Sequence, residues 1–311
     1  MLPLLLGMTF LTFFLIKIAP GDFLGSLKLN PQISEETIRL YEKKFLLDKP
    51  FIIQYLAWLK NVLHGDFGYS FSYKAEVSKV IGSRLFNTFI LSLSALIFTW
   101  VFVIPLGVLA ALKRNKSIDK FLSFFSYIGI SMPSFFLAFL LLYFATFTGW
   151  LPLGGMRSVR FDEFSLIGKI LDIARHLIIP TIVLSIGSIC VLQRIMRANL
   201  LEVLGSQYIL GAKARGLNNK RILYIHALKN AINPMVTIFG YQFSALLSGA
   251  ALIEIVLGWP GLGTVMLEAV LAQDLYLVMA SMLMGGVLLI LGNLLADILL
   301  GFFDPRIRYE R

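Results

Sequence analysis

Long apolar runs alternate with polar stretches along this chain. An α-helix rises 1.5 Å per residue, so about 20 apolar residues are needed to cross a hydrocarbon core about 30 Å thick. Six segments reach or approach this length: 2–19, 85–112, 121–147, 177–192, 235–257 and 275–303. The pattern therefore predicts an all-α polytopic membrane protein with six transmembrane helices, of which the first and the fourth are short.

Three prolines fall within the predicted helices. Pro105, Pro133 and Pro180 each remove one backbone donor, and in a membrane the freed carbonyl group must find a partner on a neighbouring helix. We expect all three prolines to be accommodated inside the spans, so these helices should pack against one another.

Composition agrees with a membrane protein and narrows the chemistry. Hydrophobic residues make up 58% and charged residues 15% of the chain, against roughly 45–50% and about 25% in soluble proteins. Cys190 is the only cysteine, which excludes a disulfide framework or a thiolate metal site, and we expect it to be a small apolar helix residue. His64, His176 and His226 are expected at surfaces or interfaces, so no metal site is predicted.

The distribution of basic residues predicts the orientation. Segments 113–120, 194–233 and 304–311 carry 14 Lys and Arg in 56 residues, whereas segments 20–82, 149–176 and 258–274 carry 12 in 108 residues. By the positive-inside rule the first set is cytoplasmic, and both termini face the cytoplasm. Topology thus explains the net charge of +10, and no nucleic acid partner is required.

The spans divide the chain into four parts. Residues 1–19 form the first transmembrane helix, which we interpret as retained and not as a cleaved signal peptide, because no basic residues precede it. Residues 20–84 form an extracytoplasmic segment with short surface helices near 34–45 and 51–63, acting either as a spacer or as a docking surface. Residues 85–303 form the permease core, which includes the cytoplasmic loop 194–233, and residues 304–311 form a cytoplasmic tail.

The loop 194–233 is long, basic and helical in pattern. Its small residues Gly211, Ala212, Ala214 and Gly216 allow the backbone of another protein to approach closely. Gly216 is expected to mark a turn between two short helices, because glycine costs about 1 kcal/mol in a helix interior, and Asn218-Asn219 is expected to break or cap a helix. The alternative is an amphipathic helix that lies on anionic lipid.

Six separated motifs carry a family resemblance. They are Ala19-Pro-Gly-Asp22, Gly65-Asp-Phe-Gly-Tyr-Ser70, Ala212-Lys-Ala-Arg-Gly-Leu217, His226-Ala-Leu-Lys-Asn-Ala231, Glu254 with Gly258-Trp-Pro-Gly-Leu-Gly263, and Asp304-Pro-Arg-Ile-Arg308. In this order they resemble the permease subunits of ABC importers, in the dipeptide, oligopeptide and nickel branch. The general signature of such permeases, Glu-Ala-Ala followed by Gly and then Ile-x-Leu-Pro, is matched only at Ala212, Gly216 and Leu228, so the loop departs from the common pattern.

The resemblance implies a type I ABC importer permease fold in the inner membrane of a prokaryote. This chain would form half of a path for peptides delivered by an extracytoplasmic solute-binding protein, together with a second homologous permease and two ATP-binding cassette ATPase subunits. ATP and Mg would be used by the ATPases, since this chain has no cofactor of its own and no phosphate-loop motif. Its coupling residues would be Tyr208, Gly211, Ala212, Lys213, Ala214, Arg215, Gly216 and Leu217.

Four further residues are candidates for a gate or for the translocation path. Glu254 precedes the Trp-Pro-Gly turn and either contributes to an outer gate or anchors that turn, while Trp259 fits an interfacial aromatic belt. Asn293 and Asp297 are four residues apart, so they share one helix face, and a carboxylate in a span should face protein or water.

Other functions remain open at this point. The same machinery could carry nickel complexes or oligosaccharides. A secondary transporter would use an ion gradient, with Glu254 and Asp297 as the available buried acids, and would usually contain an internal repeat, which we do not find. A membrane-embedded enzyme lacks support, because no pair of nucleophile and base, no carboxylate pair and no metal cluster is evident, so the set of catalytic residues is empty.

Overall fold

The computed structural model describes residues 2–18, 36, 43, 46 and 48–303. The tail 304–311 therefore lies outside the described residues. Of the surface helix expected near 34–45, only residues 36 and 43 are described. The chain divides into two compact units, the first formed by residues 1–88 and 260–290 and the second by residues 89–259 and 291–311.

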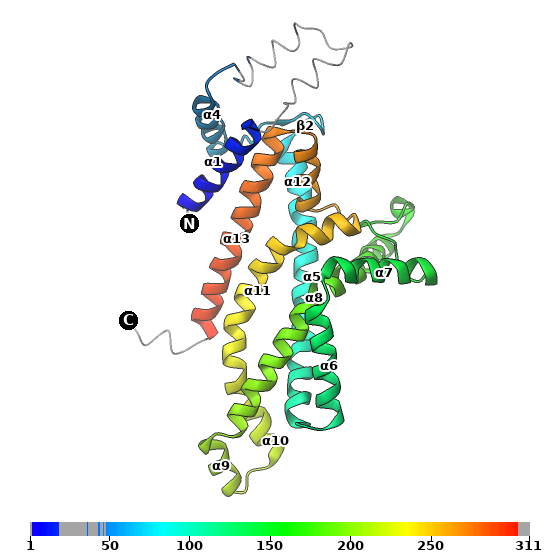
Figure 1. The fold of residues 1–311 in the computed structure, drawn as a ribbon, viewed down its shortest axis with the longest axis vertical. Coiled ribbons are helices and arrows are strands. Elements are labelled where there is room, and N and C mark those ends of the chain that lie inside the picture. Colours follow the sequence, from blue (N-terminus) through cyan, green and yellow to red (C-terminus); the bar gives the residue numbers. More distant parts are fainter. Residues whose placement is uncertain (1, 19–35, 37–42, 44–45, 47, 304–311) are drawn as a thin grey trace. The chain divides into compact units, whose positions relative to one another are not determined.

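Helices make up almost all of the described chain (Figure 1). The elements of the first half are α1 (Leu2–Ile18), α4 (Phe51–Leu63), β1 (Tyr69–Ser70), β2 (Ala75–Glu76), α5 (Val77–Leu112), α6 (Ser117–Ser131), α7 (Ser134–Thr148) and the 3-10 turn η1 (Phe161–Glu163). Those of the second half are α8 (Leu166–Leu204), α9 (Gln207–Ala214), α10 (Asn219–Arg221), the π-helical η2 (Ile222–Ala227), α11 (Leu228–Leu257), α12 (Leu262–Leu271) and α13 (Leu275–Phe303).

The predicted all-α class is confirmed, and each of the six apolar segments lies on helices. Among the described residues three helices are long and apolar enough to cross a membrane, or up to five if each bent pair counts as one span. Within the described residues helix α1 has 17 residues, at the lower end of the range of about 17–25 for a span. The fourth segment proves longer than predicted, because polar residues at both ends continue the helix to the 39 residues of α8.

The third predicted span is not one straight helix. Helices α6 and α7 meet at an angle of 104° at Met132 and Pro133. Pro133 has no N–H to continue the helix, and it forces Met132 into an extended conformation with φ −87° and ψ 120°. The expectation that Pro133 lies inside a helix is therefore wrong, whereas Pro105 and Pro180 do lie inside α5 and α8.

In the first unit, α4 packs on α1 through aromatic side chains. Phe13, Tyr55 and Trp58 are buried with Met279 of α13. The Tyr55 hydroxyl lies 3.0 Å from the Thr9 hydroxyl oxygen and donates to the carbonyl of Leu6 at 3.2 Å. The apolar stretch predicted at 51–63 is thus a helix, as expected.

The β1–β2 hairpin is fastened to the start of α13 by one carboxylate. Asp274 is fully buried, and its Oδ2 accepts hydrogen bonds from the Ser70 hydroxyl at 2.7 Å and from the backbone N–H and hydroxyl of Ser72 at 3.0 and 2.7 Å. Its Oδ1 accepts from the N–H of Leu277 at 3.3 Å, which caps the first turn of α13. Gly68 adopts φ +92°, and a Cβ there would lie 2.9 Å from the Tyr276 ring.

The same hairpin offers a pH-dependent contact. Burial and a hydrogen bond to Glu268 raise the pKa of Tyr73 to about 12. The folded state therefore favours the neutral phenol, so this contribution to stability is complete below pH 10 and is lost as the pH rises to about 12. We expect the free energy of unfolding to fall more steeply between these pH values in the wild type than in Tyr73→Phe. Equal slopes in denaturant titrations of the two proteins would contradict this.

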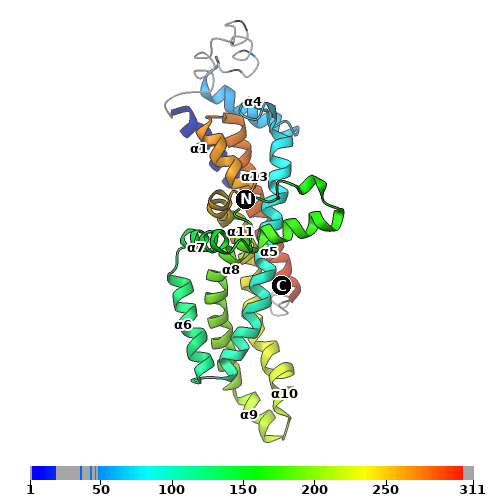
Figure 2. The same cartoon turned by 90° about the vertical axis from the view of Figure 1, so that its right-hand side faces the viewer.

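The second unit is built on α8. Its largest apolar cluster joins α5, α8, α9, η2 and α11, with Met196, Leu200, Ile209 and Met235 completely or almost completely buried. Helices α6 and α8 lie side by side in both views (Figures 1 and 2). Helix α8 contacts α6, α7, α9 and α11, and α7 also contacts α11 directly.

Helix α11 ends in a tight turn that uses glycine. Gly258 adopts φ +63°, and the N–H of Trp259 donates to the Glu254 carbonyl at 2.8 Å, which is the pattern of a Schellman motif. The N–H of Gly155 donates to the carbonyl of Leu257 at 2.9 Å. The loop after α7 thus satisfies a carbonyl group that the helix end leaves without an intrahelical partner.

Candidate functional site

Helix α9 and the turn after it, residues 207–217, form a small projection that we call the α9 segment. Ile209 and Ala212 point inward and are 0% and 2% exposed, packed in the large cluster with Ile222 and Leu223 of η2. Leu217 packs against the same cluster. Only two residues, Gly205 and Ser206, separate α9 from the end of α8. The α9 segment is therefore fixed to α8 and η2 on one side.

The other side of the α9 segment is exposed and includes small residues. Gly211, Lys213, Ala214, Arg215 and Gly216 are all exposed. A Cβ added at Gly211 or at Gly216 would meet nothing within 4 Å. The flanking side chains of Tyr208, Leu210, Tyr224 and Ile225 are large and between 47% and 61% exposed. This surface combines small residues, exposed apolar side chains and basic charge, a combination that suits close packing against another protein.

The predicted turn at Gly216 is present. Gly216 adopts φ +75°, a left-handed conformation, and its N–H donates to the Lys213 carbonyl at 2.9 Å. Asn218 then caps the next helix, because its Oδ1 accepts from the N–H of Lys220 at 3.0 Å. Both features agree with the sequence-based expectation of two short helices separated by a bend.

Two substitutions at Gly216 should differ in cost. Valine is expected to destabilise the turn by about 1–2 kcal/mol, because a β-branched residue is strained at positive φ, while asparagine tolerates this conformation better. Hydrogen exchange of the amides in residues 213–217 measures the difference, with Gly211→Ala as the control, since a Cβ fits at that position. Equal exchange in Gly216→Val and Gly216→Asn would show that the turn is not held at positive φ.

A polar cluster joins the α9 segment to the start of α11. The Asn230 side-chain amide donates to the Tyr208 hydroxyl oxygen at 2.8 Å and to the His226 carbonyl at 3.0 Å. The Tyr208 hydroxyl donates to that same carbonyl at 3.5 Å. The carbonyl belongs to the π-helical η2, whose irregular turn leaves backbone groups that need side-chain partners. Sequence reasoning missed η2, and it included Asn230 only as part of the motif 226–231, without the contacts that it makes.

Helices α8 and α11 extend into both ends of the predicted cytoplasmic loop 194–233. Residues 194–204 continue α8, and residues 228–233 already belong to α11. The polar and basic residues here lie on amphipathic helix ends, so their polarity does not mark a loop. The segment outside the long helices is therefore residues 205–227, with the α9 segment at its centre.

The candidate path residues fall into two groups. Glu254 and Trp259 lie together at the C-terminal end of α11, and both are 0% exposed. Trp259 packs with Leu91, Met156 and Ala250, so the expectation that it sits in an interfacial belt is wrong. Its ring fills the space beside the turn that the glycine motif creates. Asn293 is partly exposed and Asp297 is exposed on α13, one turn apart as predicted.

His176 and Cys190 are both buried residues of α8. His176 is buried, 7% exposed, and its Nδ1 lies 3.7 Å from the Asp172 carboxylate on the same helix, so of the two expected locations, surface or interface, it is not at the surface. Asp172 also accepts hydrogen bonds from the backbone N–H and the hydroxyl of Ser158. Cys190 is a buried free thiol on α8, as predicted. Within the described residues no group of three or more His, Cys, Asp or Glu is arranged to hold a metal ion.

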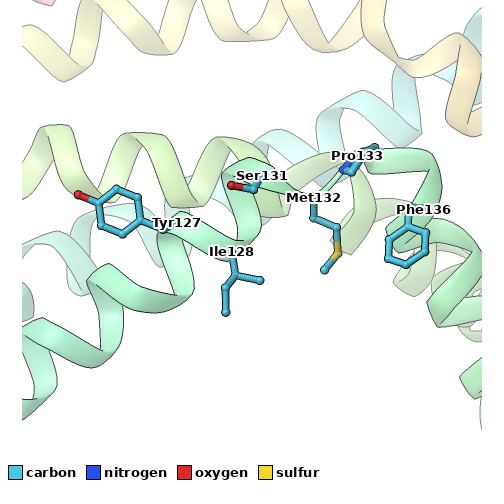
Figure 3. Close-up of a pocket in the computed structure, with 6 residues that line it drawn as sticks. All are labelled: Tyr127, Ile128, Ser131, Met132, Pro133 and Phe136. Carbon is cyan, nitrogen blue, oxygen red and sulfur yellow. The ribbon is translucent and has the colours of Figure 1, made fainter.

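A shallow apolar cavity lies at the bend between α6 and α7. Its volume is about 450 Å³. It is lined by Tyr127, Ile128, Ser131, Met132, Pro133 and Phe136. Figure 3 shows Ile128, Met132 and Phe136 on one side of the bend. The lining offers two hydroxyl groups and no charged group, so it suits an apolar surface and carries no acid–base chemistry.

Comparison with known proteins decides the family. The model of the family described as "Binding-protein-dependent transport system inner membrane component" matches residues 103–309, more than half of the chain. The chain belongs to this family. The match covers α8, the α9 segment and α11, the elements from which the candidate site is built.

Relatives of this permease extend over its whole length. It is 38% identical over 310 residues to the oligopeptide transport system permease protein AppB of Bacillus subtilis, covering 99% of this chain and 96% of the relative. It is 36% identical to the di/tripeptide transport system permease protein DppB of Pseudomonas aeruginosa, covering 100% and 97%, and 36% identical to the dipeptide permease DppB of Escherichia coli K12, covering 100% and 96%. The resemblance drawn from the six motifs is confirmed.

A solved structure supports the fold of this permease. A chain of the MetNI methionine ABC transporter, in an inward-facing conformation, matches with a TM-score of 0.52 at 16% identity, covering 71% of this chain and 96% of that chain. The type I importer permease fold is thus confirmed. The family and these relatives are transport permeases and not enzymes, so this chain is a multi-pass membrane transport subunit.

Proposed function

We propose that this permease forms half of a translocation path for peptides in an ATP-driven importer, with the α9 segment as its coupling element. The observation that carries the proposal is the two-sided construction of that segment. Ile209 and Ala212 fix its inner face to the core, while Gly211 and Ala214 leave its outer face open to another backbone. The names of the relatives, which are oligopeptide and dipeptide permeases, support peptides as the cargo.

The partner at the α9 segment is an ATPase subunit on the cytoplasmic side. Two such subunits bind ATP and Mg, since this permease supplies neither a phosphate loop nor a cofactor site of its own. A second homologous permease completes the path. The basic residues around the α9 segment support its cytoplasmic location by the positive-inside rule, and with it the cytoplasmic location of both termini. The membrane is the inner membrane of a prokaryote.

Binding of ATP must favour one conformation of the assembly over the other, because a ligand shifts an equilibrium only by its differential affinity. Movement of the ATPases would displace the α9 segment, and α8 and α11 would follow because both share its apolar cluster. All eight residues expected from the family resemblance lie in this segment. We propose that all of them take part in coupling, either by fixing the position of the α9 segment or by forming its surface.

The outer side of the permease receives peptide from a solute-binding protein. We propose that residues 20–84, which include α4 and the β hairpin, are extracytoplasmic. Glu254, Trp259, Asn293 and Asp297 are proposed as residues of the gate or of the path. The first two would act by shaping the end of α11, where both side chains are buried.

The dependence of uptake on ATP or on an ion gradient distinguishes the proposed importer from a gradient-driven transporter. The complete transporter, reconstituted in proteoliposomes with its binding protein, should take up labelled tri-alanine when ATP is enclosed with the ATPases, and an uncoupler should leave uptake intact. Removing ATP should stop uptake. Uptake that persists without ATP and stops with the uncoupler would overturn the proposal, and so would the absence of tri-alanine uptake in both conditions.

A further inference from the structure

Helix α6 is attached to α8 by polar contacts and not by an apolar face. Within α6, all of which the structure describes, the buried residues are Asp119 and Ser126. The phenylalanines Phe121, Phe124 and Phe125 of the same helix are between 49% and 61% exposed. Where helices lie in a membrane, small residues and hydrogen bonds determine which of them associate and in which register. This applies to Ser126 and Gly129, which lie in the third predicted span, while Asp119 lies just outside it, in the segment 113–120 expected on the cytoplasmic side.

These contacts form an antiparallel ladder with a fixed register. Asp119 meets Arg197, the Gln193 amide donates to the Ser126 hydroxyl oxygen, and the Arg194 guanidinium lies 4.4 Å from the centre of the Tyr127 ring. At the far end a Cβ on Gly129 would lie 2.4 Å from the sulfur of Cys190. Residues 190, 193, 194 and 197 occupy one face of α8, because they are spaced three or four apart.

The Asp119–Arg197 pair is the strongest contact of the ladder. Nε of Arg197 donates to Oδ1 and an Nη donates to Oδ2 of Asp119, both at 2.7 Å. The same Oδ2 accepts from the backbone N–H of Asn115 at 2.8 Å, which ties in the turn between α5 and α6. The Asp119 side chain is 5% exposed and that of Arg197 is 26% exposed. A planar two-bond contact fixes angle as well as distance.

The position of the pair relates it to the α9 segment. Arg197 lies seven residues, about two turns, before the end of α8, next to Met196 and close to Leu200 of the cluster that holds Ile209 and Ala212. A displacement of the α9 segment therefore reaches Arg197 through continuous helix and packed core. The two buried residues of α6 are Asp119 and Ser126, so polar contacts, together with the close approach of Gly129 to Cys190, contribute to the register between α6 and α8.

We propose that Asp119 and Arg197 are positioning residues for coupling, which make α6 move together with α8 when the α9 segment is displaced. The inference rests on the proposed function of that segment. A buried ion pair is a weak source of stability, since apolar replacements of similar size are often neutral, and its contribution here is the register that it imposes. Loss of the pair separates ATP hydrolysis from transport while the assembly remains intact.

The test compares tri-alanine uptake with ATP hydrolysis in the same proteoliposomes of the complete transporter. The variants are Asp119→Asn, the apolar pair Asp119→Leu with Arg197→Met, and the exchanged pair Asp119→Arg with Arg197→Asp. Uptake per ATP should fall by about tenfold in the first two, within the usual range of coupling between sites. The exchanged pair should recover part of the ratio, because it restores the ion pair but arginine at position 119 cannot accept the hydrogen bond from the Asn115 N–H. Glu76→Gln is the matched control, because it breaks an exposed ion pair with Lys79.

The apolar pair keeps the test decisive if Asp119→Asn fails to assemble, since it leaves no uncompensated charge. A wild-type ratio in that apolar pair would overturn the inference and leave a packing role only. No recovery in the exchanged pair, with the transporter assembled, would overturn it as well. Cross-linking of Ala214→Cys to the ATPase separates the two claims. If the cross-link is retained and uptake per ATP is normal in the apolar pair, only the inference is refuted. If the cross-link is absent from an otherwise wild-type transporter, the proposed function is refuted.

Discussion

Tryptophan at position 211 is expected to stop transport while the permease still folds and inserts. A Cβ at Gly211 meets nothing within 4 Å and the residue is exposed, so the permease itself has room for the ring. The ATPase seated on the α9 segment would have no room for the ring. We expect the steric cost of the ring in this interface to be about 2 kcal/mol, the size of a hot-spot substitution, so uptake should fall by about 30-fold. Uptake of tri-alanine in proteoliposomes measures this.

Two controls isolate the interface. Gly211→Ala adds only a methyl group and should transport normally. Gly82→Trp places the same ring on α5, where an added Cβ also meets nothing within 4 Å, and it should also transport normally. Copurification of the ATPase with each variant reports docking directly. Normal uptake and full copurification with Gly211→Trp would remove the α9 segment from the interface.

Alanine at position 274 is expected to destabilise the protein by about 3 kcal/mol or more. The substitution removes the acceptor of three hydrogen bonds from Ser70 and Ser72 and the cap of α13. Buried hydrogen bonds to a charged group contribute about 1.5–3 kcal/mol each, and an N-cap about 1 kcal/mol. The thermal unfolding midpoint in detergent measures the effect.

Asp66→Ala is the matched control for that experiment. Asp66 is an exposed carboxylate of the same hairpin region, and it accepts one described hydrogen bond, from the N–H of Gly68 at 2.8 Å. Its loss should cost about 1 kcal/mol, the usual value for a single hydrogen bond. Similar midpoints for the two variants would show that the Asp274 cluster does not hold the hairpin.

Local features of the fold were predictable from sequence. The six apolar runs identified the helices because a membrane span needs a minimum length of apolar residues. Gly216 and Asn218 identified a turn and a cap because positive φ and side-chain capping favour these residue types. The α9 segment was recognised from its small residues together with the family resemblance, and its exposed face agrees with that expectation.

Features that depend on distant partners were not predictable. The hydrogen bonds of Asp274 to Ser70 and Ser72 join residues more than 200 positions apart, and nothing in the local pattern shows which polar group a buried carboxylate will meet. Asp119 lies between Lys116 and Lys120 in the chain, and nothing in that local pattern shows that it is buried against Arg197. Trp259 was misplaced because burial of an aromatic ring at a helix end depends on the packing of Leu91 and Met156.

Proline was ambiguous for a related reason. Pro105 and Pro180 are carried inside long helices, whereas Pro133 ends α6. Sequence shows that each residue lacks a donor, but whether a helix continues depends on the groups that can satisfy the freed carbonyls. The same limit applies to η2, where Asn230 and Tyr208 supply partners for the carbonyl of His226.

Site-specific cross-linking at Ala214 tests the central claim most directly. Replacing Cys190 by alanine leaves no other cysteine in the chain, so Ala214→Cys places a single thiol on the exposed face of α9. During ATP turnover we expect this thiol to cross-link to an engineered cysteine in a cleft of the ATPase and to be protected from a water-soluble maleimide. Full labelling by the maleimide throughout turnover, with no cross-link, would contradict the assignment of the α9 segment as the coupling element.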